Sequence, residues 1–87
     1  MDAKTIQLTI ITPDKTIFEG PVQRVALPGS AGSFQVLANH APLVSTLQQG
    51  AVLYKKEQQE HTLVIEEGLV EVLNNRVTVL LASTTSD

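Results

Sequence analysis

The stretch that decides the fold reads LPGSAGSFQVLANHAPL and runs from Leu27 to Leu43. It joins a glycine-rich turn, a short apolar strand and a His-Ala-Pro-Leu corner in one run. Gly29 and Gly32 tolerate backbone angles that other residues avoid, so the residues between them are expected to form a tight, exposed loop. The stretch therefore indicates extended chain on both sides of a turn, which is typical of a β protein.

Apolar residues recur at every second position along most of the remaining chain, which is the pattern of strands with one buried face. The segment from Leu43 to Gln49 is the best helix candidate, but its β-branched residues and the following Gly50 disfavour a helix. Turn residues separate the runs at intervals of roughly eight to twelve residues, as in a sandwich or barrel. The expected inward residues are Ile6, Leu8, Ile10, Val25, Leu27, Leu63, Ile65, Val70, Val72, Val77, Val79 and Leu81.

Five short segments are expected to turn or to interrupt the strands. Thr12–Lys15 places a proline where a type I turn favours it. Asn74-Asn75 fits a two-residue hairpin turn, because asparagine tolerates positive φ. Residues 66–68 predict a further tight corner, and residues 58–61 a polar turn that contains His61. Pro21 is expected to end pairing, because it has no N–H to donate.

Several apolar residues are out of phase with the inward ones and must face away from the core. They are Ile11, Leu69, Leu73 and Leu80. A sandwich needs only one apolar face on each sheet. Either strand ends and loops cover this second face, or it docks against another subunit, since large exposed apolar patches mark interfaces.

Length and composition predict a single domain over residues 1–87, with a frayed polar tail at 82–87. The chain contains no cysteine, which excludes disulfides and thiolate metal sites. A net charge of −3, with scattered Lys and Arg, argues against a nucleic-acid partner. No apolar run is long enough to span a bilayer, and no signal peptide or direct lipid anchor is expected.

Candidate catalytic and ligand sites are weak. The loop Gly29–Gly32 lacks the Lys-Ser/Thr of a Walker A motif. His40 with Ser33 or Ser45 would need an orienting carboxylate, and none lies near in sequence. His40 is therefore expected either to bond to backbone or to contact another subunit. Two isolated histidines do not form a metal site, and no cofactor is expected.

Six ordered segments resemble the epsilon subunit of rotary ATP synthases. The first is the PG-x-x-G-x-F-x-x-L-x-x-HAPL pattern within residues 27–43. Two more lie near the ends of the chain: L-T-I-I-T-P at 8–13 and N-R-V-T-V-L at 75–80. Between them lie F-E-G-P-V at 18–22, L-Q-Q-G-A-V at 47–52 and G-L-V-E-V at 68–72. Each motif is weak alone, whereas the ordered set covers essentially the whole chain.

This resemblance implies an antiparallel β-sandwich of about ten strands in two sheets. It implies a non-catalytic subunit of the F1 central stalk that binds the gamma subunit and contacts the c-ring of a proton-translocating enzyme. By the same resemblance, Gly29, Ser30, Ala31, Gly32 and Ser33 would meet the c-ring, while Thr12, His40 and Ser45 would lie close to gamma. Ser33 stands where some family members carry an acidic residue, so no ion pair is expected there.

The resemblance also implies a peripheral place at the cytoplasmic face of the energy-transducing membrane. Most members continue into a two-helix hairpin, whereas this chain ends at Asp87. We therefore expect no hairpin-type inhibition and no ATP site. The alternatives are a stand-alone ligand-binding β-sandwich, such as a carbohydrate module, and a small hydrolase. Two Phe and one Tyr offer a sugar few aromatic platforms.

Overall fold

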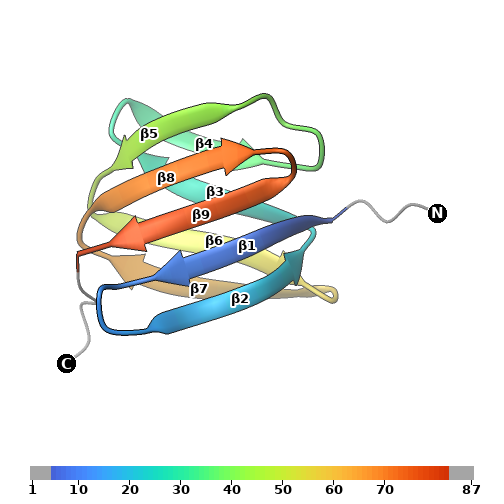
Figure 1. Cartoon of the computed structure of the whole chain (residues 1–87), viewed down its shortest axis with the longest axis horizontal. Coiled ribbons are helices and arrows are strands. Elements are labelled where there is room, and N and C mark those ends of the chain that lie inside the picture. Colours follow the sequence, from blue (N-terminus) through green and yellow to red (C-terminus); the bar gives the residue numbers. More distant parts are fainter. Residues whose placement is uncertain (1–4, 83–87) are drawn as a thin grey trace.

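Nine strands and no helix make up residues 5–82, which are the residues that this computed structural model describes (Figure 1). The all-β prediction is confirmed. Ala82 is a bend after the last strand, and the rest of the predicted tail lies outside the described residues. The strands are β1 (Ile6–Ile11), β2 (Thr16–Val22), β3 (Arg24–Gly29), β4 (Gly32–Val36), β5 (Leu43–Leu47), β6 (Gly50–Lys56), β7 (Gln59–Ile65), β8 (Gly68–Leu73) and β9 (Arg76–Leu81).

The strands form two layers, as the sandwich prediction requires. Strands β2, β1, β9, β8 and β5 lie side by side in one layer, and β4, β3, β6 and β7 lie behind them (Figure 1). The two layers are not separate sheets. Gly29 at the end of β3 pairs with Leu47 at the end of β5, so one hydrogen-bonded path runs from β2 to β7.

Two details of the strand pairing differ from the sequence prediction. The sheet is not purely antiparallel, because β1 pairs with β9 in parallel, with Leu8 beside Val77. Pro21 does not end pairing either, since β2 continues through it with Pro21 opposite Gln7. Strand β2 is the edge of the sheet, so the missing N–H of Pro21 removes no bond to a second neighbour.

One apolar core fills the space between the layers, and both layers contribute to it. Alternation along the strands places these side chains inward, and no polar side chain of residues 5–82 is buried with them. All the expected inward residues are found here except Leu63, which is half-buried against the core. The buried residues are Ile6, Leu8, Ile10, Val22, Val25, Leu27, Val36, Leu47, Val52, Ile65, Val70, Val72, Val77, Val79 and Leu81.

Aromatic side chains close the sandwich on the side away from the β3–β5 junction. The rings of Phe18 on β2 and Tyr54 on β6 lie 4.7 Å apart, and His61 on β7 stacks on Tyr54 at 5.2 Å. The Lys56 ammonium lies 5.7 Å from the centre of the Phe18 ring. The polar turn predicted at residues 58–61 is displaced: Glu57 and Gln58 form it, while His61 belongs to β7 and contributes to this seam. Burial raises the pKa of the Tyr54 phenol above its ordinary value.

Two hairpins turn through residues with positive φ. The predicted Asn74-Asn75 turn is confirmed, with φ values of 52° and 61°. Strands β6 and β7 are joined through Glu57 and Gln58, with φ values of 51° and 74°, so this turn lies slightly earlier than the one predicted at residues 58–61. A side chain in this conformation costs roughly 1–2 kcal/mol. Seven register pairs between β6 and β7 hold the second turn in place despite that cost.

Glycine should have opposite effects at two hairpin turns. Gln58→Gly relieves a positive φ, so we expect the free energy of unfolding to rise by about 0.5–1 kcal/mol. Ala31→Gly, in the β3–β4 turn, relieves no positive φ and adds freedom to the unfolded chain. It should lower stability by about 0.5–1 kcal/mol. Urea unfolding of both variants measures the difference, and an equal loss in both would contradict the account of the β6–β7 turn.

Candidate subunit interface

The β3–β4 hairpin carries an exposed tip, as the glycine-rich loop predicts. Gly29 itself is buried. A Cβ there would lie only 2.7 Å from the Gly32 carbonyl oxygen and 2.9 Å from Cε1 of Phe34, so any larger residue would force its neighbours to move. Ser30 and Ala31 form the turn, and Gly32 opens β4 with φ 137°. Four of the five residues expected to meet the c-ring, Ser30 to Ser33, are thus presented to solvent as one protrusion.

Two hydrogen bonds fasten the tip to β5, and a third joins the end of β3 to the residue after β5. The backbone N–H of Ser30 donates to the Thr46 carbonyl at 3.0 Å, and that of Gln48 donates to the Pro28 carbonyl at 2.9 Å. The Thr46 hydroxyl donates to the Ser30 hydroxyl oxygen at 2.8 Å. The tip is thus part of the layer that contains β3 and β4 and is also hydrogen-bonded to β5 in the other layer.

An outward apolar row crosses the layer that contains β5, β8, β9 and β1. Ile11 pairs with Leu80, and Leu80 pairs with Leu69, so the three side chains lie beside one another on adjacent strands. Leu69 in turn pairs with Thr46. We call Ile11, Leu80 and Leu69 the apolar row. Leu69 and Leu80 are 37% and 40% exposed, and Ile11 is half-buried. Other described residues thus leave this face open.

Two further apolar side chains lie on the same face. Leu73 is 44% exposed and lies farther along β8 than Leu69. Val44 is 65% exposed on β5, two residues before Thr46, and the sequence analysis missed it. Its phase could have revealed it, since a residue between inward-facing neighbours such as Leu43 must point outward in a strand.

The tip and the apolar row meet at a shallow hollow. Its wall is shared by the tip, the ends of β5 and β9 and the start of β8, so the protrusion and the apolar face form one continuous surface. The lining residues are Ser30, Thr46, Leu47, Glu67, Gly68, Leu69, Leu80 and Ala82.

The two ends of the molecule carry different predicted residues. We call the end where β1, β5 and β9 finish the tip end, because the β3–β4 tip lies there, and the opposite end the corner end (Figure 1). Thr12 follows β1 and so lies at the tip end, whereas His40 precedes β5 and lies at the corner end. Ser45 lies within β5 opposite buried Val70, on the inward face of the sheet.

Each of these three residues has a side-chain atom in a local hydrogen bond. The Thr12 hydroxyl accepts the N–H groups of Asp14 and Lys15, both at 3.3 Å, which confirms the predicted turn. Nδ1 of His40 lies 2.7 Å from the Ala41 carbonyl oxygen, so His40 bonds to backbone as one of its two predicted roles required. The Ser45 hydroxyl donates to the Thr46 carbonyl at 3.0 Å. None of these bonds prepares a nucleophile.

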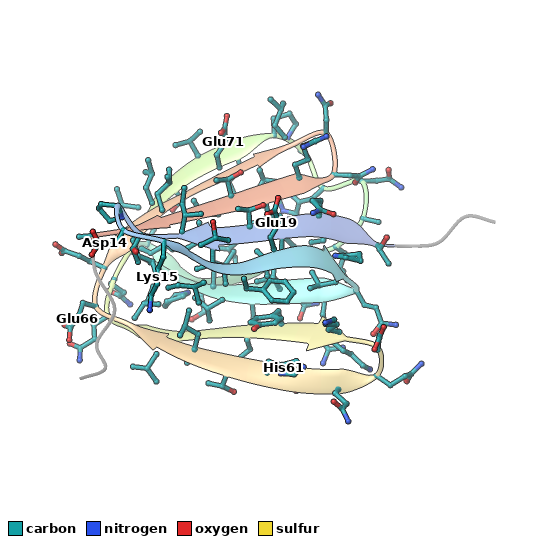
Figure 2. All side chains as sticks on the ribbon, turned by 60° about the horizontal axis from the view of Figure 1, so that its bottom comes forward. Asp14, Lys15, Glu19, His61, Glu66 and Glu71 are labelled. Carbon is teal, nitrogen blue, oxygen red and sulfur yellow. The ribbon has the colours of Figure 1, made fainter. Side chains whose placement is uncertain are left out.

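Titratable side chains do not converge on a reaction centre in the described part of the chain. Asp14, Lys15 and Glu66 lie at the tip end, while Glu71 and His61 lie on other parts of the surface (Figure 2). Residues 5–82 contain no group of three or more carboxylate or imidazole ligands that could hold a metal ion. The arrangement therefore offers surfaces for contact rather than acid–base or metal chemistry.

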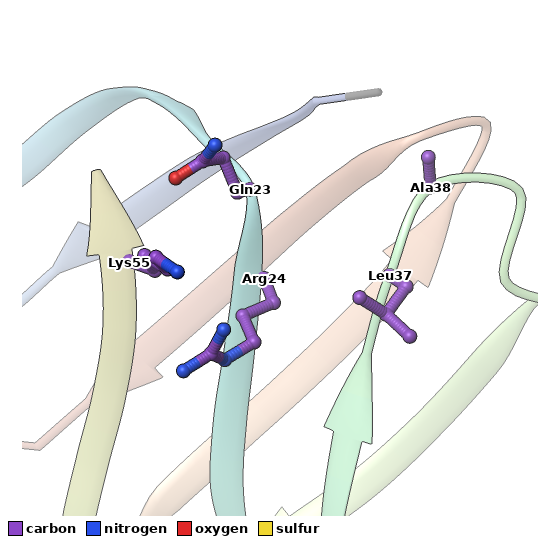
Figure 3. Close-up of a pocket in the computed structure, with 5 residues that line it drawn as sticks. All are labelled: Gln23, Arg24, Leu37, Ala38 and Lys55. Carbon is purple, nitrogen blue, oxygen red and sulfur yellow. The ribbon is translucent and has the colours of Figure 1, made fainter. Parts of the chain in front are cut away.

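A second hollow, of about 390 Å³, lies beside β3, β6 and the end of β4 (Figure 3). Gln23, Arg24, Leu37, Ala38 and Lys55 line it. Arg24 forms an ion pair of 3.4 Å with Glu60, and the Gln23 side-chain oxygen accepts the Gln58 N–H. No aromatic ring lines this hollow, so it does not have the platform that a sugar-binding module uses.

Comparison with known proteins decides between these possibilities. The family described as the β-sandwich domain of the ATP synthase delta/epsilon chain matches residues 5–86. The chain belongs to this family. Among its curated relatives, the ATP synthase epsilon chain of Desulfosudis oleivorans is 42% identical over 82 residues. That of Leptospira interrogans is 38% identical over 80 residues. The epsilon chain is a non-catalytic subunit of ATP synthase.

The alignments leave part of the relatives unmatched. They cover 93% and 92% of this chain but only 62% and 63% of the two epsilon chains. The chain therefore spans less than two thirds of the length of these relatives.

Solved structures share the fold. A chain of the Euglena gracilis mitochondrial ATP synthase, in a structure of its OSCP, F1 and c-ring parts, aligns with a TM-score of 0.86 at 25% identity, covering 93% of this chain and 52% of its own. A chain of the Tetrahymena thermophila mitochondrial enzyme aligns at 0.75 and 14% identity, covering 88% of this chain and 63% of its own, which shows the fold alone. Within residues 5–82 no helix has the length and apolar character needed to cross a membrane.

Proposed function

We propose that the chain forms the β-sandwich part of an epsilon subunit in the central stalk of a proton-translocating F-type ATP synthase. In this role it binds the gamma subunit and contacts the membrane c-ring, so that proton flow through the ring is coupled to ATP synthesis. Family membership supports the assignment to the enzyme, and the outward apolar row supports the assignment to a subunit contact.

The apolar row carries this proposal because the fold does not need it. The inward residues alone close the core, and no polar side chain in the described region is buried with them. Replacing Leu69 and Leu80 by polar residues would cost the isolated domain little, yet both remain apolar and open to solvent. Contiguous apolar side chains on a protein surface mark sites of protein contact. We assign this face to gamma.

The tip at Gly29–Ser33 is assigned to the c-ring. It protrudes at the tip end, and the two hydrogen bonds between Ser30 and Thr46 tie it to β5, the strand that flanks the apolar row. A force applied at the tip thus passes into β5 and the sheet through fixed bonds. This arrangement suits a subunit that must turn as one piece with both partners.

The three residues assigned to gamma span the length of the sheet. Thr12 directly follows Ile11 of the apolar row, and His40 lies at the corner end. If gamma contacts both Thr12 and His40, its contact surface extends along the outer face from the tip end to the corner end and passes over Leu73. Ser45 faces inward, so it supports this contact surface through its neighbour Val44 rather than through its own hydroxyl.

The proposed role also gives the chain a place in the cell. As part of the complex it is peripheral, at the cytoplasmic face of the energy-transducing membrane. Contacts with gamma and the c-ring hold it there, and no step of the reaction passes through its own side chains.

Charges placed on the apolar row should weaken binding to gamma. In Leu69→Glu and Leu80→Glu a carboxylate would have to lose its water in a contact built from apolar side chains. We expect each to weaken binding to the gamma-containing F1 sector by about tenfold to a hundredfold, as for a residue at the centre of an interface. Isothermal calorimetry with F1 prepared without this subunit measures the effect.

Val64→Glu is the matched control for these two variants. Val64 is a similarly exposed aliphatic residue, 51% exposed, but it lies on β7 in the other layer. It should leave affinity for F1 within about twofold of wild type, with folding monitored by circular dichroism. If Leu69→Glu and Leu80→Glu bind F1 as tightly as wild type, or if Val64→Glu weakens binding equally, the assignment of this face to gamma is wrong.

Single cysteines can test the tip against the c-ring, because the chain has no cysteine of its own. Ala31→Cys and Ser33→Cys, each carrying a short photoreactive maleimide, should form crosslinks to the c subunit in the assembled enzyme. Gln59→Cys, at the corner end on β7, should form none. Crosslinks from Gln59→Cys with none from the tip would reverse the proposed orientation on the ring.

A further inference from the structure

One residue, Asn75, joins three segments at the corner end. Asn75 lies in the turn between β8 and β9, and its side-chain oxygen accepts the backbone N–H of Asn39 at 2.6 Å. Its own carbonyl oxygen accepts the N–H of Gln7 on β1 at 2.9 Å. Asn39 and Asn75 are 36 residues apart, so this bond fixes the loop between β4 and β5 against a distant hairpin.

The loop that Asn75 holds has a defined turn of its own. The His40 N–H donates to the Leu37 carbonyl at 3.2 Å, which closes a four-residue turn. Asn39 is the third residue of that turn and has φ 69°. A type II turn requires positive φ at this position and accepts glycine or asparagine there. The N–H of Asn39 therefore points out of the turn with no partner inside it, and the Asn75 oxygen supplies one.

The turn also orients the imidazole of His40. A carbonyl oxygen can only accept, so the 2.7 Å contact with Ala41 requires that Nδ1 carries the proton. Nε2 is then the atom left to meet another subunit. Its direction depends on the backbone at residues 39–41, and the Asn75 bond secures that backbone to the sheet.

We propose that Asn75 is a positioning residue: by accepting the Asn39 N–H it holds the β4–β5 corner in the form that presents His40 to gamma. This inference rests on the proposed function for its partner, while the bond itself does not. Asn75 touches no partner in this account and acts through Asn39 and His40.

Three variants separate the hydrogen bond from the backbone conformation. Asn75→Gly keeps the positive φ of 61° without strain and removes the acceptor. Asn75→Asp keeps an acceptor oxygen at the same distance along the side chain, and aspartate also tolerates this conformation. Asn74→Gly is the matched control, since it removes the same side chain at φ 52° in the same turn without touching the bond to Asn39.

Amide hydrogen exchange measures the bond directly and needs no partner. In Asn75→Gly the Asn39 amide should exchange about 3- to 10-fold faster than in wild type, the factor expected for one net hydrogen bond. In Asn75→Asp and Asn74→Gly it should exchange at close to the wild-type rate. An unchanged rate in Asn75→Gly would overturn the inference, as would the same increase in Asn74→Gly.

Binding to F1 prepared without this subunit measures the consequence. Asn75→Gly should bind at least about threefold more weakly than wild type, with Asn75→Asp restoring the affinity. His40→Ala should weaken binding in the wild-type background and add little in the Asn75→Gly background, because both changes act through the same contact.

The outcomes distinguish the inference from the proposed function. If wild type fails to bind F1, the proposed function fails, and the exchange rates still decide whether Asn75 holds the corner. If wild type binds and Asn75→Gly binds equally well despite faster exchange at Asn39, the positioning role of Asn75 is wrong while the proposed function stands. Losses from Asn75→Gly and His40→Ala that simply add would also contradict the positioning role.

Discussion

Alternation of inward and outward side chains along most strands is the constraint on which the rest of the structure depends. Each strand gives one face to a shared core, and a slip of one residue in any pairing would turn a whole strand inside out. Leu8, Val70 and Val79 show how completely the inward face is used, since each is fully buried. The outward residues are not needed to form the core, so apolar residues among them require a separate explanation.

The register of the strand pairs brings these outward apolar residues together into one surface. The parallel pairing of β1 with β9 brings Ile11 beside Leu80, and the antiparallel pairing of β9 with β8 adds Leu69. The same row ends at Thr46, whose backbone and hydroxyl hold the β3–β4 tip. The pairing of Gly29 with Leu47, which joins the two layers into one sheet, lies at this point as well. The apolar face and the protruding tip are consequently parts of one hydrogen-bonded body.

The sequence was sufficient for the fold class, the core and most turns, because those follow from local alternation and local turn chemistry. It could not show the parallel β1–β9 pair, which joins the two ends of the chain and depends on the path of every strand between them. The prediction that Pro21 ends pairing is wrong for a similar reason. A proline can continue a strand at the edge of a sheet, and the sequence does not show that β2 is the edge strand. The polar turn predicted at residues 58–61 lies at Glu57 and Gln58 instead, because the β6–β7 register fixes its position and imposes their positive φ.

The candidate surface was predictable in part. Ile11, Leu69 and Leu80 could be identified from their phase, but their alignment into one row depends on register between strands. Val44 is absent from that set, although its place beside inward-facing Leu43 in a strand also predicts an outward side chain. The bond from Asn39 to Asn75 has no sequence signal, because it joins two turns that only the folded sheet brings together.

Titration of the chain into the F1 sector prepared without this subunit tests the central claim most directly. Calorimetry and size-exclusion co-elution should show one chain bound per gamma subunit, with a dissociation constant of about micromolar or tighter, the range of interfaces near the standard ~800 Å² per partner. A chain that is folded by circular dichroism but does not bind at tens of micromolar would contradict the assignment of its apolar face to gamma.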